Sequence, residues 1–177
     1  EMIAEQWGIE RSELDQIGYE SQMRAIRATE EGRFETQIVP VEVTLDDGTT
    51  EMMTVDEGIR FETTIEKLAG LQPAFKPDGI VTAGNSSRIS DGAAALLIMD
   101  EDTAEKMGLE PMARFKAFSL AGVDPVMMLT GPIPATSKAL DRAGMSIDDI
   151  DLFEVNEAFA SVTAAWRIEH GGSDPMA

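Results

Sequence analysis

The run Val155-Asn156-Glu157-Ala158-Phe159-Ala160 places two polar side chains where a predicted strand passes directly into a predicted helix. In open α/β sheets, ligands bind at the carboxyl ends of strands. Asn156 carries both an amide donor and an acceptor, so it could hold a reacting group at such an edge. On local sequence alone a plain N-cap role for Asn156 is favoured, and Glu157 could simply complement the helix dipole.

A second candidate is the loop Ala83-Gly84-Asn85-Ser86-Ser87-Arg88, inside a stretch from Pro73 to Asp91 that is rich in Gly, Ser, Asn and Pro. A long irregular stretch in a compact protein is more often functional than filler. Glycine lets a ligand approach the backbone, and the hydroxyls and the amide offer hydrogen bonds. Because such loops also serve as ordinary connections, this pattern alone is a weak signal.

The methionine and histidine residues give weaker evidence for a functional site. Met127-Met128 precedes Gly131-Pro132, where methionine most often fills a core, although it also suits a soft wall around an acyl chain. His170 is the single histidine, and we expect it to face solvent without a catalytic role.

The composition of the 177 residues excludes several other chemistries. With 14 Lys and Arg against 33 Asp and Glu, the net charge of −19 argues against nonspecific nucleic-acid binding and against docking on an anionic membrane. Zero cysteines exclude a disulfide framework and a thiol nucleophile within these residues, and one histidine cannot build a multi-histidine metal site. The hydrophobic fraction of 43% permits a cytosolic enzyme or binding module.

The chain shows no targeting or membrane signal. Its start lacks the basic and apolar regions of a secretory peptide, and the run from Ala93 to Met99 is far shorter than the ~20 residues of a membrane-spanning helix. Because the chain has no initiator Met and opens inside a predicted helix, we expect an excised segment of a longer protein.

The elements that must position the candidate sites follow from the periodicity. The first 70 residues read as mostly helical: a short helix that Gly8 ends, and an amphipathic lid or packing helix from an N-cap at Ser12 to Gly32. The β-branched run 38–43 and the turn residues Asp46-Asp47-Gly48 then predict a strand and a turn.

The residues after Asp91 predict an α/β layer. The expected elements are a buried strand or short core helix at 93–99, a helix at 103–107, a strand at 113–118, a helix at 134–143, a strand at 151–155 and a helix at 157–168. The β-α-β-α order of the last third implies a sheet with a parallel component.

Together these residues resemble the central part of a thiolase, the family of enzymes that make or cleave 3-oxoacyl-CoA. The similar motifs occur in order over essentially the whole chain: Ser21-Gln22, Gly32-Arg33-Phe34, Ile38-Val39-Pro40, Asp56-Glu57-Gly58-Ile59-Arg60, Val81-Thr82-Ala83-Gly84-Asn85-Ser86-Ser87, Ser90-Asp91-Gly92-Ala93-Ala94-Ala95, Gly131-Pro132-Ile133-Pro134-Ala135 and Asn156-Glu157-Ala158-Phe159. The Thr-Ala-Gly-Asn, Asp-Gly-Ala-Ala-Ala and Asn-Glu-Ala-Phe runs in this order make the resemblance highly specific.

The resemblance implies a thiolase-like layered α/β fold, present in part. Residues 1–87 would be a mostly helical loop (lid) domain with a β-hairpin. Residues 88–112 would supply a buried strand and helix that complete the N-terminal thiolase domain. Residues 113–177 would be the first part of the C-terminal βαβα domain.

The implied activity is that of an acyl-CoA acyltransferase. Thiolases carry out Claisen condensation or thiolytic cleavage of 3-oxoacyl-CoA through an acyl-cysteine intermediate, with coenzyme A or acyl-CoA as substrate and no permanently bound cofactor. A cytoplasmic homodimer or homotetramer in fatty-acid metabolism such as β-oxidation is implied, together with the remainder of the thiolase chain and with neither nucleic acid nor membrane as a partner. The acyl chain, from acetoacetyl to long fatty or steroid side chains, and the direction of the reaction stay open.

Site roles are implied position by position. Asn156 is similar to the catalytic Asn that holds a water in an oxyanion hole, where a positioned donor stabilises a developing negative charge. The coenzyme A residues implied are Ser87 on the pantetheine arm with Ala83 and Phe75 beside it, and Arg60 near the nucleotide end. The substrate pocket implied consists of Ala158 and Phe159 in the channel and Met128 at the acyl group. No metal is implied.

Three catalytic residues of the family are absent from the sequence: a nucleophilic Cys, a second Cys that acts as acid and base, and the His of a Gly-His-Pro motif. In the family the first Cys precedes the matched stretch and the other two follow it, so truncation at both ends explains their absence better than evolutionary loss. A natural non-catalytic acyl-CoA or lipid-binding protein, and an acidic structural module without a ligand, remain as alternatives.

Overall fold

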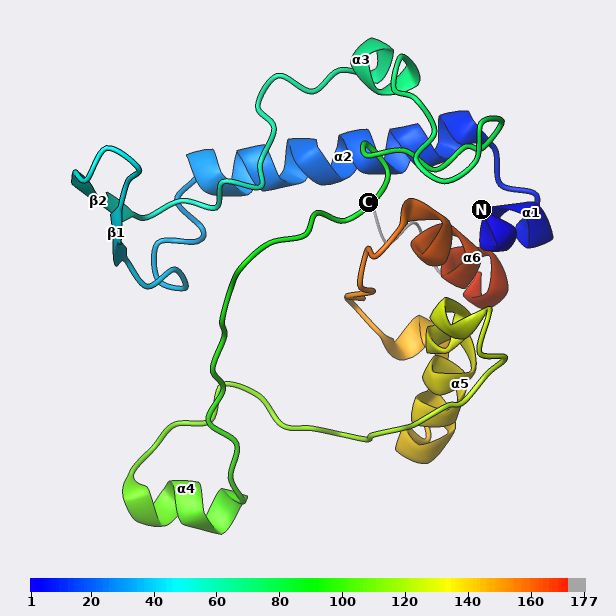
Figure 1. Ribbon diagram of the computed structural model, residues 1–177. Coiled ribbons are helices and arrows are strands. Elements are labelled where there is room, and N and C mark those ends of the chain that lie inside the picture. The colour runs from blue at the N-terminus through cyan, green and yellow to red at the C-terminus, as the bar shows by residue number, and fades with distance from the viewer. Residues whose placement is uncertain (172–177) are drawn as a thin grey trace. The chain divides into compact units, whose positions relative to one another are not determined.

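The computed structural model describes residues 1–171, which form two compact units (Figure 1). Among the described residues, the first unit comprises Glu1–Arg88 and Asn156–Ala165, and the second comprises Ile89–Val155 and residues 166–171. The chain passes between the units after Arg88, after Val155 and after Ala165, the last of these within helix α6 (Ala160–His170). The second candidate loop and the Asn156 motif therefore belong to the same unit.

The first unit begins with helices α1 (Met2–Trp7) and α2 (Arg11–Glu30). Gly8 ends α1 in the left-handed conformation, as predicted, and its amide donates to the Ala4 carbonyl. The prediction of an N-cap at Ser12 is wrong, because Glu10 is the last extended residue and Ser12 already lies in the first turn. An acid in the first turn, Glu13, is favourable there without a side-chain cap.

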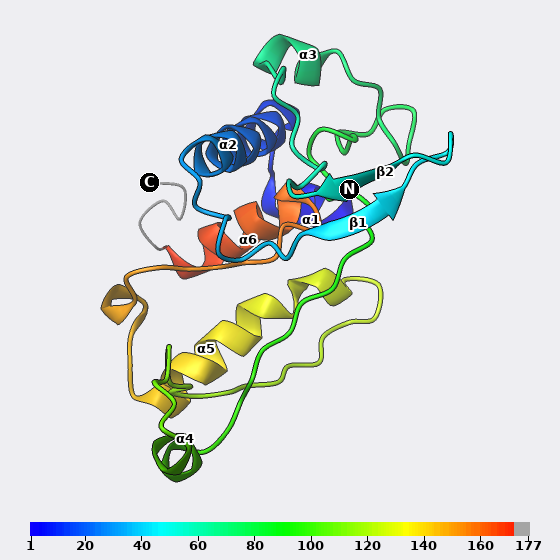
Figure 2. The same ribbon diagram turned by 90° about the vertical axis from the view of Figure 1, so that its left-hand side faces the viewer.

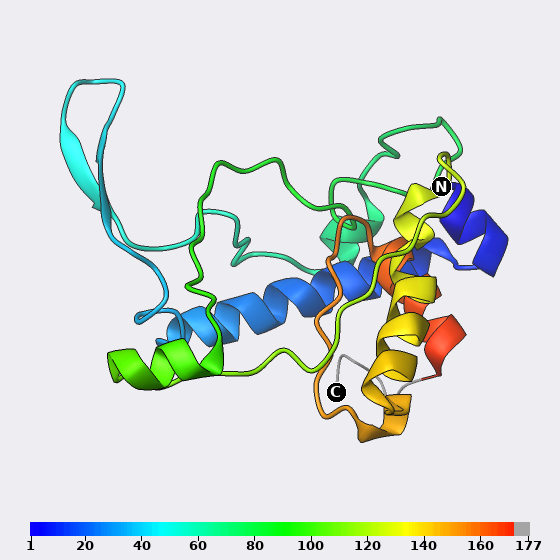
Figure 3. The same cartoon turned by 90° about the horizontal axis from the view of Figure 1, so that it is seen from below.

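A short β-hairpin follows α2, and Figure 3 shows it standing off the C-terminal end of that helix. Strands β1 (Val41–Thr44) and β2 (Thr50–Met53) pair antiparallel, with Thr44 opposite Thr50. The predicted turn is confirmed: the Asp47 carboxylate accepts from the Thr49 amide at 2.9 Å. The strand begins later than predicted because Pro40 has no N–H to donate to a neighbouring strand.

Helix α3 (Ile65–Ala69) lies along α2 (Figures 1 and 2). Its N-cap is Thr64, whose hydroxyl accepts from the Lys67 amide at 3.2 Å. Leu68 is the buried residue of this helix.

The core of the first unit gathers small and branched side chains from distant segments. Its buried apolar members are Ile3, Ala4, Ile9, Leu14, Ile17, Leu68, Val81, Ala160, Val162, Ala164 and Ala165. Each fully buried aliphatic side chain of the larger kind stabilises the fold by about 1.5–3 kcal/mol. Helix α2 contributes Leu14 and Ile17 to this set and contacts α3, so it is a central element of the unit.

The second unit contains α4 (Glu101–Met107), α5 (Pro132–Ala143), the end of α6 and two short 3-10 turns, η1 (Met128–Thr130) and η2 (Ile147–Asp149). The helices predicted at 103–107 and 134–143 are confirmed with slightly earlier starts. No described helix is both long and apolar enough to cross a bilayer.

Trp166 is the centre of the second unit. Its indole N–H donates to Thr136 Oγ1 at 2.9 Å, and its ring lies 5.1 Å from that of Phe153. His170 lies one turn later on α6, 5.0 Å from the Trp166 ring and 3.1 Å from the Ile133 carbonyl oxygen. The prediction that His170 faces solvent is therefore wrong, because the helix continues far enough to carry it onto Trp166.

The strands predicted at 93–99, 113–118 and 151–155 are not formed. Over residues 1–171, strand pairing is confined to the β1–β2 ladder and one bridge between Ser86 and Phe159. Figure 1 shows the three segments as extended chain, and Leu96 is 83% exposed. An apolar run reveals a need for burial, but a strand also needs a hydrogen-bonded neighbour, which the described chain does not give these segments. The alternative of a core helix at 93–99 is wrong as well.

Candidate functional site

One face of helix α2 holds the candidate site together. Arg11, Asp15, Gly18 and Gln22 recur every three or four residues, so they lie in a row along the helix. Each contacts a segment that follows the hairpin, and Ser21 beside them contacts the Asn156 motif. The site is therefore organised by a polar stripe on a helix whose neighbouring face enters the core.

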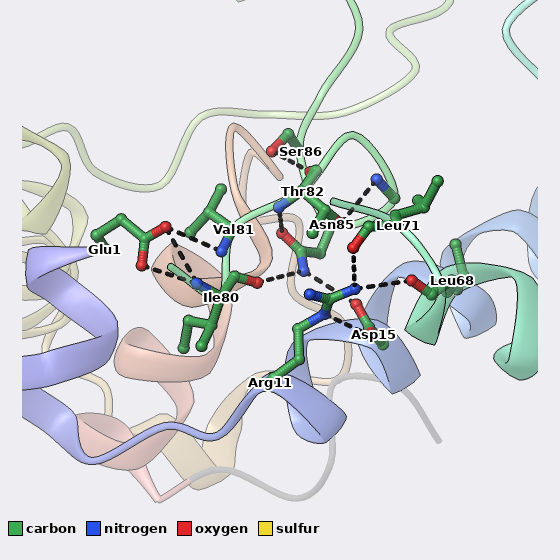
Figure 4. Close-up of polar contacts among 11 residues, drawn as sticks. Glu1, Arg11, Asp15, Leu68, Leu71, Ile80, Val81, Thr82, Asn85 and Ser86 are labelled. Carbon is green, nitrogen blue, oxygen red and sulfur yellow. Dashed lines mark hydrogen bonds and ion pairs between the residues drawn. The ribbon is translucent and has the colours of Figure 1, made fainter. Parts of the chain in front are cut away.

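The loop at residues 82–87 is fastened to α2 by a buried amide. Asn85 is only 4% exposed, and its Nδ2 donates to Asp15 Oδ1 at 3.0 Å and to the Ile80 carbonyl at 3.1 Å (Figure 4). Its Oδ1 accepts from the Thr82 amide at 2.9 Å. Both amide hydrogens are used, so Asn85 shapes the loop and does not offer the ligand-binding amide expected from the sequence.

The hydroxyl groups of the two serines in this loop differ in their surroundings. Ser86 Oγ donates to the Thr82 carbonyl at 2.7 Å, which closes the loop on itself. Ser87 is exposed, and within residues 1–171 its hydroxyl makes no hydrogen bond. Ser87 is thus the hydroxyl of the loop that is available to a ligand.

Two glycines allow the loop to sit directly on the helices. A Cβ at Gly18 of α2 would fall well inside contact distance of the Gly84 carbonyl oxygen. A Cβ at Gly84 would lie 2.5 Å from Leu68 Cδ2 and 2.8 Å from Leu71 Cδ1. At Gly18 the close approach is to backbone and at Gly84 it is to two leucine side chains, and both leave little room for a side chain.

The structure brings the loop and the Asn156 motif together. Ser86 and Phe159 form an antiparallel bridge, the Ser87 amide donates to the Ala158 carbonyl at 3.0 Å, and the Ala160 amide donates to the Asn85 carbonyl at 2.9 Å. Two motifs far apart in the sequence therefore run side by side.

Aromatic rings meet at the same place. The Phe75 and Phe159 rings make an edge-to-face contact, with centroids 5.9 Å apart and planes at 75°. Ala83 is exposed on the loop, and Ala158 is half-buried beside Ser87. Five of the predicted site residues, Phe75, Ala83, Ser87, Ala158 and Phe159, thus belong to one region of the first unit.

Asn156 is not the N-cap that local sequence favours. Helix α6 begins at Ala160, four residues later, and the Asn156 side chain is exposed and makes no hydrogen bond in the described chain. The expectation that Glu157 complements the helix dipole is wrong, because α6 begins three residues later and has no acidic residue in its first turn. Glu157 Oε2 instead accepts from Ser21 Oγ of α2 at 2.7 Å. Within the described residues, the Asn156 side-chain amide therefore does not stabilise the fold through a hydrogen bond.

Arg60 lies at a separate hollow of about 410 Å³ in the first unit. The hollow is lined by Ile59, Arg60, Phe61, Glu62, Thr63, Lys67, Leu68 and Leu71. The Arg60 amide donates to Gln22 Oε1 of α2 at 2.8 Å, whereas no acid among the described residues pairs with its guanidinium. A free guanidinium beside apolar walls suits a phosphate-bearing ligand, even in a chain of net charge −19.

Helix α1 holds the chain that leads into the loop. The Glu1 carboxylate accepts from the Ile80 and Val81 amides, and Glu5 forms an ion pair with Lys76. Burial raises the pKa of Glu1, but these two amides and the nearby positive charges outweigh it, so the pKa lies below its ordinary value. The hydrogen bond and charge from Glu5 raise the pKa of Lys76.

Met128 lies in the second unit, at the start of η1, and is 67% exposed. It does not fill the core of that unit, contrary to the role most often taken by methionine. Its role at an acyl pocket stays a prediction. No group of three His, Cys, Asp or Glu side chains in the described part of the chain is placed to hold a metal ion.

Sequence reasoning missed the residues of α2 that position the site. From the sequence, Asp15 is predicted only as an acidic residue in the first turn of a helix. Ser21-Gln22 is recognised as a thiolase-like motif, but no structural role is predicted for it. The available signal was the recurrence of polar or small residues at 11, 15, 18 and 22, which share one face of a helix.

Two family models match the chain. Residues 1–102 match "Thiolase, N-terminal domain", and residues 109–171 match "Thiolase, C-terminal domain". A probable acetyl-CoA acyltransferase of Staphylococcus epidermidis is 51% identical over 165 residues, which are 93% of this chain and 42% of that protein. A 3-ketoacyl-CoA thiolase of Marinobacter nauticus is 48% identical over 161 residues, which are 90% of this chain and 41% of that protein. The chain thus spans about two fifths of the length of these relatives.

Solved structures agree with this assignment. The crystal structure of the Bacillus anthracis acetyl-CoA acetyltransferase matches 97% of this chain with a TM-score of 0.92 and 43% identity. That of human mitochondrial 3-ketoacyl-CoA thiolase matches the same share with a TM-score of 0.91 and 42% identity. In each case the match covers 43% of the solved chain, so the expected thiolase-like α/β fold is confirmed as a partial one. The chain belongs to the thiolase family.

Proposed function

We propose that this chain is the central part of an acyl-CoA acyltransferase that performs Claisen condensation or thiolytic cleavage of 3-oxoacyl-CoA. The single observation that supports this most is the bridge between Ser86 and Phe159, which lays the Ser87 loop against the Asn156 motif. The Ser87 loop is suited to hold the thiol-bearing arm of a ligand, and the Asn156 motif is suited to hold a carbonyl oxygen. A thioester reaction requires both in one place.

The pantetheine arm of coenzyme A would lie along the Ser87 loop. This arm is a narrow chain of amides and methylenes, which needs apolar walls and few hydrogen bonds. The Phe75–Phe159 pair and Ala83 supply apolar surface, and the free Ser87 hydroxyl supplies the hydrogen bond. The nucleotide end would use the hollow at Arg60, where the unpaired guanidinium attracts phosphate.

Asn156 would act on the thioester carbonyl. Its free amide can hold a water that donates to the oxygen as negative charge develops there, which is the role of an oxyanion hole. The Ser21–Glu157 hydrogen bond holds the next residue and so limits the positions open to Asn156. Ala158 and Phe159 would line the substrate channel, and Met128 would line the acyl pocket.

The covalent step must come from outside these residues. The sequence has no cysteine, so the nucleophilic Cys, the acid/base Cys and their activating His would be supplied by the remainder of a longer thiolase chain. The three-part division at 1–87, 88–112 and 113–177, a cytoplasmic location, a homodimeric or homotetrameric state and a role in β-oxidation belong to the same proposal. The 177 residues alone would bind but not turn over acyl-CoA.

The test is an assay of the full-length protein that carries this chain, with acetoacetyl-CoA and coenzyme A as substrates and calorimetric binding of coenzyme A alongside. The proposal expects thiolysis and binding by the full-length protein, and no thiolysis by the 177-residue chain. Binding without thiolysis by the full-length protein would instead support a non-catalytic acyl-CoA-binding protein. A full-length protein that neither cleaves acetoacetyl-CoA nor binds coenzyme A would contradict every ligand-binding role given above.

A further inference from the structure

We propose that Arg11, Asp15 and Asn85 form a positioning network that fixes the spacing between the two walls of the coenzyme A surface. The nucleotide wall is defined here as the lining of the Arg60 hollow, and the pantetheine wall as the loop at 82–87. The inference rests on the proposed function, because it takes one ligand to reach both walls.

Arg11 connects the network to the nucleotide wall. Its Nη2 donates to the Leu68 carbonyl at 2.8 Å and to the Leu71 carbonyl at 3.2 Å (Figure 4). Both leucines line the Arg60 hollow. The carbonyls stand at the C-terminal end of α3, where a positive charge is favourable.

Asp15 carries the connection across the helix. Its Oδ2 accepts from Arg11 Nε at 2.7 Å, and its Oδ1 accepts from Asn85 Nδ2 at 3.0 Å. The residue is 3% exposed, so its charge is removed from water and depends on these two donors. In such surroundings each hydrogen bond is stronger than in water, and moving either partner is costly.

Asn85 ends the network on the pantetheine wall. Its side-chain amide donates to the Ile80 carbonyl and accepts from the Thr82 amide. Its backbone carbonyl accepts from the Ala160 amide. The fixed backbone at 82–86 is what presents Ser87. A continuous row of hydrogen bonds therefore runs from the hollow at Arg60 to the loop at Ser87.

The arrangement indicates positioning more than stabilisation. A buried ion pair is seldom more stable than apolar packing of the same volume, whereas it holds its partners in one geometry. Each wall also has its own contact with α2, through Gln22 for Arg60 and through Gly18 for Gly84. Gly84 of the pantetheine wall also lies against Leu68 and Leu71 of the nucleotide wall, and the network adds a hydrogen-bonded link to this apolar contact. A ligand that touches both walls binds with an effective concentration that depends on how well their separation is held.

The test uses the full-length protein and three ligands: coenzyme A, adenosine 3′,5′-bisphosphate as its nucleotide half, and pantetheine as its thiol half. In Asp15→Asn the side chain keeps its shape, but an NH2 group replaces one of the two carboxylate oxygens. That group cannot accept from the donor, Arg11 Nε or Asn85 Nδ2, that it then faces. We expect the Kd of coenzyme A to rise at least tenfold and the Kd of each half to change less than twofold. The kcat at saturating coenzyme A should also stay within twofold, because neither Asp15 nor Asn85 touches the ligand in this proposal.

Arg11→Lys is the second variant, since it keeps the positive charge beside Asp15 and loses the planar fork. It should raise the Kd of coenzyme A about threefold to tenfold, again without changing the halves. Ile17→Val is the matched control, because it removes a buried methyl from the same helix without touching the network. It should leave all three Kd values within twofold.

Two results would overturn the inference. One is an unchanged Kd for coenzyme A in folded Asp15→Asn and Arg11→Lys proteins. The other is a loss of affinity for the two halves as large as that for coenzyme A. A wild-type protein that does not bind coenzyme A would be a failure of the proposed function, and it would be seen before any variant is made.

Discussion

Ser21 Oγ donates to Glu157 Oε2 at 2.7 Å, joining residues that are 136 positions apart in the sequence. The bond links the middle of α2 to the residue that follows Asn156. Because Asn156 itself makes no hydrogen bond in the described chain, its position depends on its neighbours. Through this hydrogen bond, Ser21 of α2 fixes the residue next to Asn156, the proposed oxyanion-hole residue.

Ser21→Ala should lower kcat in the thiolysis assay of the full-length protein. The Ser21–Glu157 bond is exposed to water, so we expect it to contribute about 1 kcal/mol, which corresponds to roughly a fivefold effect. The KM for coenzyme A should change less than twofold, because the Ser87 loop keeps its own contacts with α2.

Ser12→Ala is the control for this change. It is the same substitution on the same helix, at an exposed serine without a hydrogen bond among the described residues. Equal kcat values for the two variants would mean that Ser21 does not act through Glu157.

Gly18→Ala should destabilise the protein. Alanine favours a helix interior over glycine by about 1 kcal/mol, so helix propensity alone predicts a gain in stability. The added Cβ would collide with the Gly84 carbonyl oxygen, and overpacking against a backbone typically costs about 1–3 kcal/mol. We expect the collision to prevail and the thermal unfolding midpoint to fall.

Gly122→Ala provides the comparison, since a Cβ there meets no atom within 4 Å. Its unfolding midpoint should stay near the wild-type value. A Gly18→Ala protein as stable as wild type would show that the loop can move away from α2 at little cost.

The N-cap of α4 should respond to pH. Hydrogen bonds from the Thr103 hydroxyl and then the Thr103 amide hold the pKa of Asp100 below its ordinary value of 3.8. A carboxyl whose pKa is lowered by folding stabilises the folded state above the unfolded pKa, and this contribution is lost as pH falls through the folded pKa. The cap should therefore be intact above about pH 4 and weaken below it.

The measurement is the chemical shift of the Thr103 amide during an acid titration. In wild type it should titrate with a midpoint below 3.8, and in Asp100→Asn the same transition should be absent. Asp102→Asn, in the same first turn, is the control and should keep the transition. A Thr103 shift that titrates identically in Asp100→Asn would assign the effect to another group.

The helices were the most predictable part of the fold. Gly8 and Gly144 end α1 and α5 in the left-handed conformation, and the turn at Asp47 follows from local side-chain chemistry. Such features depend on neighbours in sequence. The strands predicted at 93–99 and 113–118 depend on partners elsewhere, which no local pattern can supply.

The site could be predicted in its parts but not in its assembly. Ser87 and Asn156 were identified through motifs, yet the backbone bonds that join their segments involve Ser86, Ala158 and Asn85, whose sequence positions carry no such information. Local propensity also assigned Asn156 to an N-cap, because asparagine is common there. Only the start of α6 at Ala160 shows that the amide is free.

Replacing Ser87 and Asn156 should separate binding from chemistry in the proposed thiolase. Ser87→Ala removes one hydrogen bond to the pantetheine arm, so the KM for coenzyme A should rise about fivefold to tenfold with kcat within twofold. Asn156→Ala removes the donor that holds the oxyanion-hole water, so kcat should fall about 10²- to 10³-fold while the KM changes little.

Ser90→Ala is the control for both, as an exposed serine outside the two motif segments that the Ser86–Phe159 bridge joins. It should leave kcat and KM within twofold of wild type. If Asn156→Ala instead raised the KM and kept kcat, the amide would bind the ground state of the substrate and not the developing oxyanion. If Ser87→Ala lowered kcat alone, the Ser87 loop would belong to the reacting end of the thioester, because a residue on the pantetheine arm is not expected to change a saturated rate.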